Sequence, residues 1–324
     1  MTSLDSILNK IETEISDIQY PGQPESLYSP IKYVLSLGGK RIRPILTLIA
    51  CNIYSEEIDQ AVKSAIGIEV FHNFTLLHDD LMDEADKRRN KPTVHKVWNP
   101  NTAILSGDAM MIAAYQLMTE TPKEHLKEVL DLFTSTALDI CGGQQYDMLF
   151  EKRLDVTEEE YIEMIKMKTA VLLACSLKTG AILGGASPKD ADLLYDYGVN
   201  IGLAFQLQDD LLDVFGNTEV FGKNIGGDIL CNKKTFLLIN AIKCSDDSQR
   251  KELISWIERE DFEPKEKIAF FTSLYSDLQI KELTENKIKT YHNKAEECLN
   301  NLSVSPERLQ ILREFSDSLM VRES

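Results

Sequence analysis

Several features that would point to a membrane, zinc-binding or strand-rich protein are missing from this chain. No apolar run approaches the roughly 18 residues that a transmembrane helix needs, so we expect no membrane-spanning segment. The six cysteines include no C-x-x-C pair, which argues against a zinc site and predicts buried thiols in a cytoplasmic protein. Alternating strand patterns are scarce, whereas helical periodicity runs through nearly the whole sequence.

Positive charge is also in short supply. The formal net charge of −17 argues against nonspecific nucleic-acid binding, although metals and local basic residues can reverse the sign inside a cleft. Residues 1–20 form an amphipathic pattern without the basic start and apolar core of a signal peptide, and we expect no stable membrane insertion. No low-complexity linker separates two halves, so we expect one all-α domain over residues 1–324.

The most unusual stretch is Asp79-Asp80-Leu81-Met82-Asp83, which ends a long apolar helical run that begins near Ala61. In an α-helix, Asp79 and Asp83 stack one turn apart on one face, with Asp80 on the flank. Like charges at this spacing repel each other and weaken a helix. Taken alone, the cluster is more typical of a solvated acidic helix end than of a metal site.

A second copy of the pattern changes this interpretation. Asp209-Asp210-Leu211-Leu212-Asp213 also ends an apolar helical run, residues 193–212. Two clusters of the same spacing, far apart in the sequence, suggest two jaws that face each other across a cleft. Carboxylate oxygens suit magnesium, which is usually completed by waters and substrate phosphates. We therefore predict magnesium ligands at Asp79, Asp80, Asp83, Asp209, Asp210 and Asp213.

Basic residues gather at two turns of the otherwise acidic chain. The segment Gly38-Gly39-Lys40-Arg41-Ile42-Arg43-Pro44 combines backbone freedom, three cations and a helix start, whose free amides complete an anion site. Taken alone, this turn fits a solvated loop equally well. The second turn, residues 87–93, follows the first aspartate cluster directly, and its adjacent Arg88 and Arg89 could each address a different diphosphate.

Helices are predicted at residues 102–119, 123–151 and 157–183. Pro30 is expected in the first turn of a helix that runs to about Leu37. Gly142-Gly143 interrupts the second of the three long helices and allows close packing or a kink.

Three further positions carry chemical interest. His72 shares the helix face of Asp79 but lies beside two phenylalanines, so a core role and a ligand role stay equally open. Lys168 lies in an apolar setting, where a snorkelling lysine is the plain alternative. The loop 216–231 combines glycines with Lys223, which suggests a mobile flap over phosphate, and Lys233-Lys234-Thr235 opens the next helix.

The combined pattern resembles the trans-isoprenyl diphosphate synthases, or polyprenyl synthetases, which include farnesyl and geranylgeranyl diphosphate synthases. The resemblance covers nearly the whole chain. Its markers are Gly39-Lys40-Arg41-Ile42-Arg43-Pro44, the first aspartate cluster with Arg88-Arg89 and Lys91-Pro92-Thr93, Gly107-Asp108, Lys168-Thr169, Phe205-Gln206-Leu207-Gln208-Asp209-Asp210 with Asp213, and the Lys223, Asp228 and Lys233 segment.

Two details of the resemblance need comment. Asn90 stands where the family usually has glycine after the two arginines, but asparagine adopts the same turn conformation. Lys178-Thr179 is a second Lys-Thr pair that could compete for the role of Lys168-Thr169. We prefer the first pair, because the small residues 180–186 then fall where the family has them.

The resemblance implies an all-α fold, a single-domain isoprenoid synthase barrel of about ten core helices around a central cavity, usually a homodimer. It also implies a reaction. An allylic diphosphate loses its diphosphate, isopentenyl diphosphate attacks the resulting cation, and a proton leaves to the released diphosphate. The departing anion needs stabilisation, which the family obtains from magnesium, about three ions in each substrate-bound site.

The resemblance also implies roles for individual residues. It identifies Asp79, Asp83 and Asp209 as metal-holding catalytic residues, and Thr169 and Gln206 as oxygen dipoles toward the cation. The allylic diphosphate contacts are Arg88, Lys168, Lys223 and Lys233, and the isopentenyl diphosphate contacts are Lys40, Arg43, His72 and Arg89.

Product length follows from the position of a plug. In this family, bulky residues four or five positions before the first aspartate form the floor of the product cavity, here Thr75 and Phe74. Phe74 is the expected plug, with Phe71 deeper on a neighbouring face. The floor then lies roughly 13–15 Å below the diphosphate, which predicts a short-chain product with farnesyl slightly ahead of geranylgeranyl diphosphate.

Two other functions are less consistent with the sequence. A class I terpene cyclase would carry an Asn/Ser/Glu second metal motif and would not need the basic turn before Pro44. A catalytically silent regulatory subunit of a prenyl synthase would usually lose one aspartate motif, and both are present here. A turnover assay with isopentenyl diphosphate separates the three.

Overall fold

The computed structural model describes residues 2–216 and 226–320, so Lys223 and most of the predicted phosphate flap lie outside the described residues. Within these ranges the chain is helical except for one short antiparallel hairpin, β1 (Lys87–Arg88) with β2 (Lys91–Pro92). The all-α prediction is therefore confirmed.

The chain divides into two compact units, and four helices contribute residues to both. The first unit comprises Met1–Thr134, Cys175–Leu194 and Ser303–Leu312, and the second comprises Ser135–Ala174, Tyr195–Leu302 and Arg313–Ser324. The shared helices are α7 (Lys123–Phe150), α9 (Val171–Gly184), α10 (Pro188–Phe215) and α17 (Gln310–Met320). A single domain over residues 1–324 stays a prediction.

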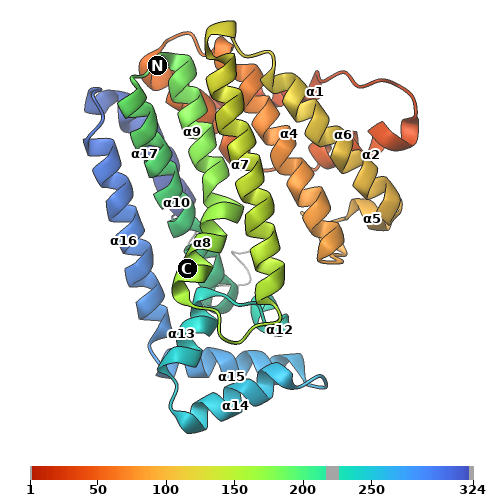
Figure 1. Ribbon diagram of the computed structural model, residues 1–324, viewed down its shortest axis with the longest axis vertical. Coiled ribbons are helices and arrows are strands. Elements are labelled where there is room, and N and C mark those ends of the chain that lie inside the picture. The colour runs from red at the N-terminus through yellow and green to blue at the C-terminus, as the bar shows by residue number, and fades with distance from the viewer. Residues whose placement is uncertain (1, 217–225, 321–324) are drawn as a thin grey trace. The chain divides into compact units, whose positions relative to one another are not determined.

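In the first unit, α4 and α6 lie side by side (Figure 1). A Cβ on Gly67 of α4 would come within 3.1 Å of the Ala114 carbonyl oxygen on α6, so the missing side chain lets the two backbones approach closely. Helix α4 is buried around most of its circumference, as its apolar sequence requires. The helices that lie wholly within this unit are α1 (Leu4–Ser16), α2 (Glu25–Ser36), α3 (Ile42–Tyr54), α4 (Asp59–Met82), α5 (Val94–Val97), α6 (Pro100–Met118) and η2 (Pro306–Leu309).

The second unit has its own hydrophobic core, in which Tyr161, Phe236 and Phe271 are almost fully buried. Thr157 opens α8 with a capping box to Glu160, and Thr235 caps the helix that follows Lys233 and Lys234, as predicted. The remaining elements are α8 (Glu158–Ile165), η1 (Lys166–Ala170), α12 (Gly227–Leu230), α13 (Phe236–Cys244), α14 (Asp247–Glu258), α15 (Pro264–Asp277) and α16 (Ile280–Asn300).

Two helix predictions need correction. Pro30 lies well inside α2, which begins at Glu25, because a further turn is tied to α6 by a hydrogen bond from Ser106 Oγ to the Leu27 carbonyl (3.0 Å). The helix predicted over residues 157–183 is interrupted by the π-helical turn η1, which contains Lys168 and Thr169. A π turn accommodates one extra residue and cannot be read from an apolar periodicity.

The cysteine prediction is wrong in part. None of the six forms a disulfide in the described ranges, and Cys51 and Cys175 are buried. Cys141, Cys231 and Cys244 are exposed, because they occupy the solvent-facing side of a helix or turn.

One segment, Glu158–Gly184, is long and apolar enough by composition to cross a membrane. Within the structure, 72% of its most apolar window is buried. Such burial is the ordinary property of a core helix, and the segment is weak evidence for a membrane span.

Candidate active site

The first aspartate motif lies at the carboxyl end of α4. Asp79 is half-buried in the last turn, and Asp83 is the exposed C-cap, whose backbone N–H donates to the Asp79 carbonyl (2.8 Å). Negative side chains are unfavourable at a helix carboxyl end, where the unsatisfied carbonyl groups already carry partial negative charge. This arrangement costs stability and therefore indicates a functional requirement.

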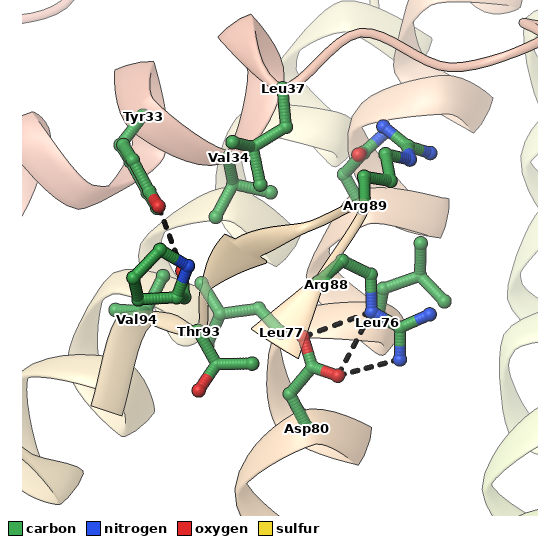
Figure 2. A pocket seen from close by; sticks show the side chains of 12 residues that line it. Tyr33, Val34, Leu37, Leu76, Leu77, Asp80, Arg88, Arg89, Thr93 and Val94 are labelled. Atoms are coloured by element: carbon green, nitrogen blue, oxygen red, sulfur yellow. Dashed lines mark hydrogen bonds and ion pairs between the residues drawn. The ribbon is translucent and has the colours of Figure 1, made fainter. Parts of the chain in front are cut away.

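Asp80 is the buried member of the motif, with an exposed fraction of 6%. Arg88, on strand β1, donates to it from two atoms, with Nε at 2.9 and 3.0 Å from the two carboxylate oxygens and Nη2 at 2.6 Å from Oδ1 (Figure 2). Such a forked, charge-assisted pair is among the stronger polar contacts in proteins. Asp80, a predicted metal ligand, and Arg88, a predicted diphosphate contact, thus form an ion pair with each other.

Arg89 points away from Asp80 (Figure 2) and approaches the glycine turn. A Cβ on Gly39 would lie only 2.6 Å from Arg89 Nη2, and Gly39 has φ +141°, so this position needs glycine for both space and conformation. Arg89 and Asn90 both adopt positive φ, at 51° and 62°. The expectation that Asn90 fits the turn is confirmed.

The basic turn separates into residues with different roles. Arg41 is buried and structural, because it bonds Glu12 and Glu69 at 2.9 Å each and the Leu35 carbonyl at 3.0 Å. Arg43 Nε is buried without a hydrogen-bond partner in the described part of the chain, and burial lowers the pKa of Arg43 to about 10. Lys40 is exposed.

His72 belongs to the same positive region. Burial, followed by the charges of Arg43, Arg89 and Arg88, lowers the pKa of His72 well below its usual value. The structure therefore brings together His72, Arg43 and Arg89, three of the four residues predicted for isopentenyl diphosphate. A half-buried guanidinium whose Nε has no partner among the described residues, in a group of like charges, forms a site that favours an anion.

The second aspartate motif lies near the carboxyl end of α10, with Asp209 half-buried. Asp210 is almost fully buried, and its two oxygens accept hydrogen bonds from Gln206 Nε2 (3.0 Å) and from the Tyr161 hydroxyl. Burial, together with nearby Asp228, raises the pKa of Asp210 to about 7.

Asp213 connects this motif to the turn that follows. Its Oδ2 accepts a hydrogen bond from the Asp228 backbone N–H (3.0 Å), and burial raises the pKa of Asp213. Lys233 lies 3.9 Å from the Asp228 carboxylate. Predicted residues from two separate segments therefore meet in the second unit.

The π-helical turn positions Lys168 and Thr169. Lys168 Nζ donates to Asp147 (2.6 Å), and Thr169 Oγ1 donates to Gln206 Oε1 (3.2 Å). A Cβ on Gly143 would lie 2.4 Å from the Lys168 backbone nitrogen, so the predicted close packing at Gly142-Gly143 is confirmed. Turns of this kind occur frequently at functional sites.

The competing Lys-Thr pair has a different environment. Lys178 donates to the exposed Asp192 (2.5 Å), and Thr179 is buried beside the Cys175 sulfur (3.9 Å). Thr169, by contrast, is hydrogen-bonded to Gln206, which also donates to Asp210 of the second aspartate motif. This contrast supports the preference for Lys168-Thr169.

Sequence reasoning missed three partners of the predicted residues. Tyr161 holds Asp210, Asp147 holds Lys168, and His78 packs between α4 and α6. A weak signal existed for Tyr161, which precedes Lys168 by two helical turns and shares its face. The other two depend on contacts between helices that are distant in sequence.

The predicted plug residues belong to a row of aromatic rings in the first unit. The Phe74 ring lies edge-on to Phe71 (5.3 Å between centroids), which lies edge-on to Phe133 of α7 (5.1 Å). Phe71 is 2% exposed, whereas Phe74 is half-buried. Thr75 is turned back to its own helix, where its hydroxyl donates to the His72 carbonyl (2.8 Å).

The residues fit magnesium in chemical type. Among the described residues, no group of three or more acidic, histidine or cysteine side chains is arranged to hold a metal by itself. Magnesium needs fewer protein ligands than this, since it retains waters and takes substrate phosphate oxygens. Asp79, Asp83 and Asp209 are at least partly accessible and supply hard oxygen donors, whereas both oxygens of Asp80 and of Asp210 already have protein partners.

Comparison with known proteins gives a consistent result. The polyprenyl synthetase family model matches residues 24–274. A short chain isoprenyl diphosphate synthase of Methanothermobacter thermautotrophicus is 42% identical over 76% of this chain and 75% of its own. A geranylgeranyl diphosphate synthase of Methanosarcina mazei is 40% identical over 75% and 76%. A crystal structure of a geranylgeranyl pyrophosphate synthase superposes with a TM-score of 0.95 at 44% identity, covering 100% of both chains.

These matches define the class of protein as an all-α isoprenoid synthase. The chain belongs to the polyprenyl synthetase family, the trans-isoprenyl diphosphate synthases. Its members are prenyltransferases that act on isopentenyl and allylic diphosphates and generally depend on magnesium, so the predicted family and reaction class are confirmed.

Proposed function

We propose that the protein condenses isopentenyl diphosphate with an allylic diphosphate and releases geranylgeranyl diphosphate as its main product. The observation that carries the proposal is the positive group of Arg43, Arg89 and His72 beside the first aspartate motif. A strongly acidic chain gathers arginines here, and the buried Nε of Arg43 has no partner among the described residues, so an anionic substrate would stabilise this group.

Isopentenyl diphosphate binds to this positive group. Arg89 lies against Gly39, and Arg43 begins α3, so the diphosphate reaches both guanidinium groups and the exposed Lys40. His72 is neutral, because burial and then the charges of the surrounding arginines lower its pKa, and it donates one N–H to the anion without adding charge. The substrate is thus held by ionic contacts and oriented by a neutral donor.

Asp79, Asp83 and Asp209 would hold magnesium, and Arg88, Lys168, Lys223 and Lys233 would contact the allylic diphosphate. Bound magnesium supplies Lewis-acid stabilisation of the departing diphosphate. Thr169 and Gln206 direct oxygen dipoles toward the allylic cation, and their mutual hydrogen bond fixes both side chains. Tyr161 and Gln206 orient Asp210, which lies behind the metal ligands in this proposal. Asp80 could bind a metal only after giving up contacts to Arg88, and Asp210 only after giving up contacts to Tyr161 or Gln206.

The product assignment differs from the sequence expectation, which placed farnesyl slightly ahead. Two of the three relatives named above are geranylgeranyl synthases, and the third has a short-chain name. Phe74 is half-buried and Thr75 is turned to its own helix, so of these two residues only Phe74 presents a bulky ring that could stop the growing chain. The Phe74 ring supports a limit on the length of the product chain. The names of the relatives favour geranylgeranyl diphosphate over the shorter farnesyl diphosphate.

We also propose a homodimer in the cytoplasm. Helix α6 exposes three large apolar side chains, Ile104 (44%), Leu105 (60%) and Ile112 (58%), which lie along one side of the helix. Exposed apolar side chains in such a row favour an interface with a second copy of the chain. Light scattering after gel filtration measures the mass, and Leu105→Glu with Ile112→Glu is expected to yield monomers.

The test of the proposed function is incubation with labelled isopentenyl diphosphate and each allylic primer, followed by mass spectrometry of the products. Linear geranylgeranyl diphosphate as the product would support the whole proposal. Farnesyl diphosphate would support the condensation reaction but contradict the proposed product length. Cyclic hydrocarbon would identify a terpene cyclase, and no turnover would identify a silent subunit. Arg43→Ala is expected to raise KM for isopentenyl diphosphate more than for the allylic partner. Lys178→Ala, which removes a partly exposed lysine paired with Asp192, is its control.

A further inference from the structure

Gly107 is one of the residues that carry the family resemblance. It lies on α6, where a Cβ would come within 2.2 Å of His78 Nε2 and 2.5 Å of Cδ2. Real side chains do not approach this closely, so the imidazole of His78 occupies the space that any other residue at position 107 would fill. The glycine is therefore explained by the histidine opposite it.

The imidazole is also held by a hydrogen bond. His78 Nε2 lies 3.2 Å from the Ile104 carbonyl oxygen of α6, and since a carbonyl only accepts, Nε2 carries the proton. One side of the ring thus contacts the α6 backbone at Ile104 and Gly107. These contacts leave the ring little freedom to rotate.

The other side of the imidazole contacts the proposed plug. The His78 and Phe74 rings lie edge-on, with centroids 4.9 Å apart and planes at 71°. Phe74 contacts Phe71 in the same manner at 5.3 Å, and Phe71 is buried against Phe133. Phe74 therefore lies between a fixed imidazole and a fixed phenyl ring, in the arrangement that aromatic pairs prefer.

We propose that His78, through its contacts with Gly107 and Phe74, is a positioning residue that sets product length by holding the Phe74 ring in place. The inference rests on the proposed function and names a determinant outside the three positions expected from the sequence, Phe71, Phe74 and Thr75. Removal of the imidazole opens space beside Gly107 into which the Phe74 ring can turn. The floor then recedes, and the growing chain can extend further.

The test compares His78→Ala and His78→Gln with the parent protein, each also combined with Phe74→Ala. Glutamine can still donate to the Ile104 carbonyl but has no ring, so it separates stacking from hydrogen bonding. Product distributions are measured by mass spectrometry, with KM for isopentenyl diphosphate and the thermal midpoint determined in parallel. Both His78 variants are expected to shift the product toward one additional isoprene unit without raising this KM.

The double variants decide whether the effect acts through Phe74. In the Phe74→Ala background, either His78 change is expected to produce no further shift. A His78→Ala product distribution equal to that of the parent would overturn the inference. So would a full shift in the Phe74→Ala background, or a His78→Gln variant that behaves like the parent.

Failure of the inference is distinguishable from failure of the proposed function. If the parent protein makes no prenyl diphosphate, the proposed function itself is wrong. If the parent makes it and His78→Ala leaves its length unchanged, only the role of His78 is wrong. Gly107→Ala adds a check that retains the imidazole, since a Cβ pushes the ring toward Phe74 and is expected to shift the product in the shorter direction.

Discussion

The two aspartate motifs have the same spacing, but the protein supports their second carboxylates in different ways. Asp80 is paired with the cation Arg88, whereas Asp210 accepts hydrogen bonds from the neutral donors Tyr161 and Gln206. A guanidinium cancels the charge of a buried carboxylate, while neutral donors only solvate it. Burial and the charge of nearby Asp228 raise the pKa of Asp210 to about 7.

The motifs also differ in their last member. Asp83 ends α4 as an exposed cap, whereas α10 continues past Asp213 to Phe215. Asp213 accepts the Asp228 backbone N–H and thereby ties α10 to the turn that carries Lys233. Equal sequence spacing thus does not mean equal function, and the variants below test where the equivalence ends.

The largest effects are expected where the motifs are equivalent. Asp79→Ala and Asp209→Ala should each reduce kcat by more than about 100-fold, since even outer-shell partners of metal sites contribute about 10–100-fold. Folding should survive in both, because removal of one of several crowded carboxylates relieves repulsion. Steady-state kinetics with a magnesium titration measures the loss, and near-normal activity of either variant at saturating magnesium would refute the two-motif mechanism.

Unfolding free energies should distinguish the ionic partner of Asp80 from the neutral partner of Asp210. Arg88→Ala leaves Asp80 buried without its cation and is expected to cost about 3 kcal/mol of unfolding free energy. Tyr161→Phe should cost only about 1–2 kcal/mol, because Gln206 still donates to Asp210. Denaturant unfolding at constant pH gives both values.

Tyr115→Phe is the matched control, since its hydroxyl makes only a long contact of 3.4 Å to Thr134. Its expected effect is within about 0.5 kcal/mol. Equal costs for Arg88→Ala and Tyr161→Phe would show that the charge of the partner is not the important difference.

A comparison of the two Lys-Thr pairs tests which lysine acts in the reaction. Lys168→Ala is expected to lower kcat by about 10-fold or more, because it removes a cation placed beside the reacting centre. Lys178→Ala removes a surface pair with the exposed Asp192 and should change stability by less than about 1 kcal/mol. If Lys178→Ala impaired turnover as much as Lys168→Ala, the assignment of the pairs would be wrong.

The smallest effect is expected for the pH dependence of stability at His72, on the helix that carries the first motif. His72 has a lowered pKa in the folded chain, so between that value and about 6.5 the unfolded state binds the extra proton. Stability contributed by this residue is therefore present above pH 6.5 and falls as the pH drops through this window. Arg41, Arg43, Arg88 and Arg89 are the charges that oppose protonation. His72→Gln should flatten the fall of the thermal midpoint between pH 7 and pH 5, and an unchanged slope would argue against a neutral His72.

Much of this arrangement was predictable from local patterns. Apolar periodicity predicted α4 and α10, and the repeated spacing identified Asp79 and Asp209 without any knowledge of the fold. The glycine turn predicted an anion site that includes Arg43, and the second basic turn supplied Arg89. These features are encoded by residues a few positions apart, which is the range over which sequence patterns carry information.

Other features depend on helix packing and had no local signal. Tyr161 meets Asp210 across 49 positions, and Lys168 meets Asp147 across 21. The basic turn looked uniform in sequence, but the left-handed conformation of Arg41 turns its side chain inward, to Glu69. Which of three neighbouring cations becomes structural is decided by the carboxylates that the fold places around it.

The guanidinium of Arg41 has a consequence for how the chain can be shortened. It joins three helices of the first unit, through Glu12 on α1, Leu35 on α2 and Glu69 on α4. The family match begins only at residue 24, so a fragment cut there would keep every proposed substrate contact and still lose Glu12. Arg41 would then retain only Glu69 of its two carboxylates, directly beside Lys40 and Arg43. The amino-terminal helix thus serves as scaffolding for substrate capture, although none of its own residues is proposed to contact the substrate.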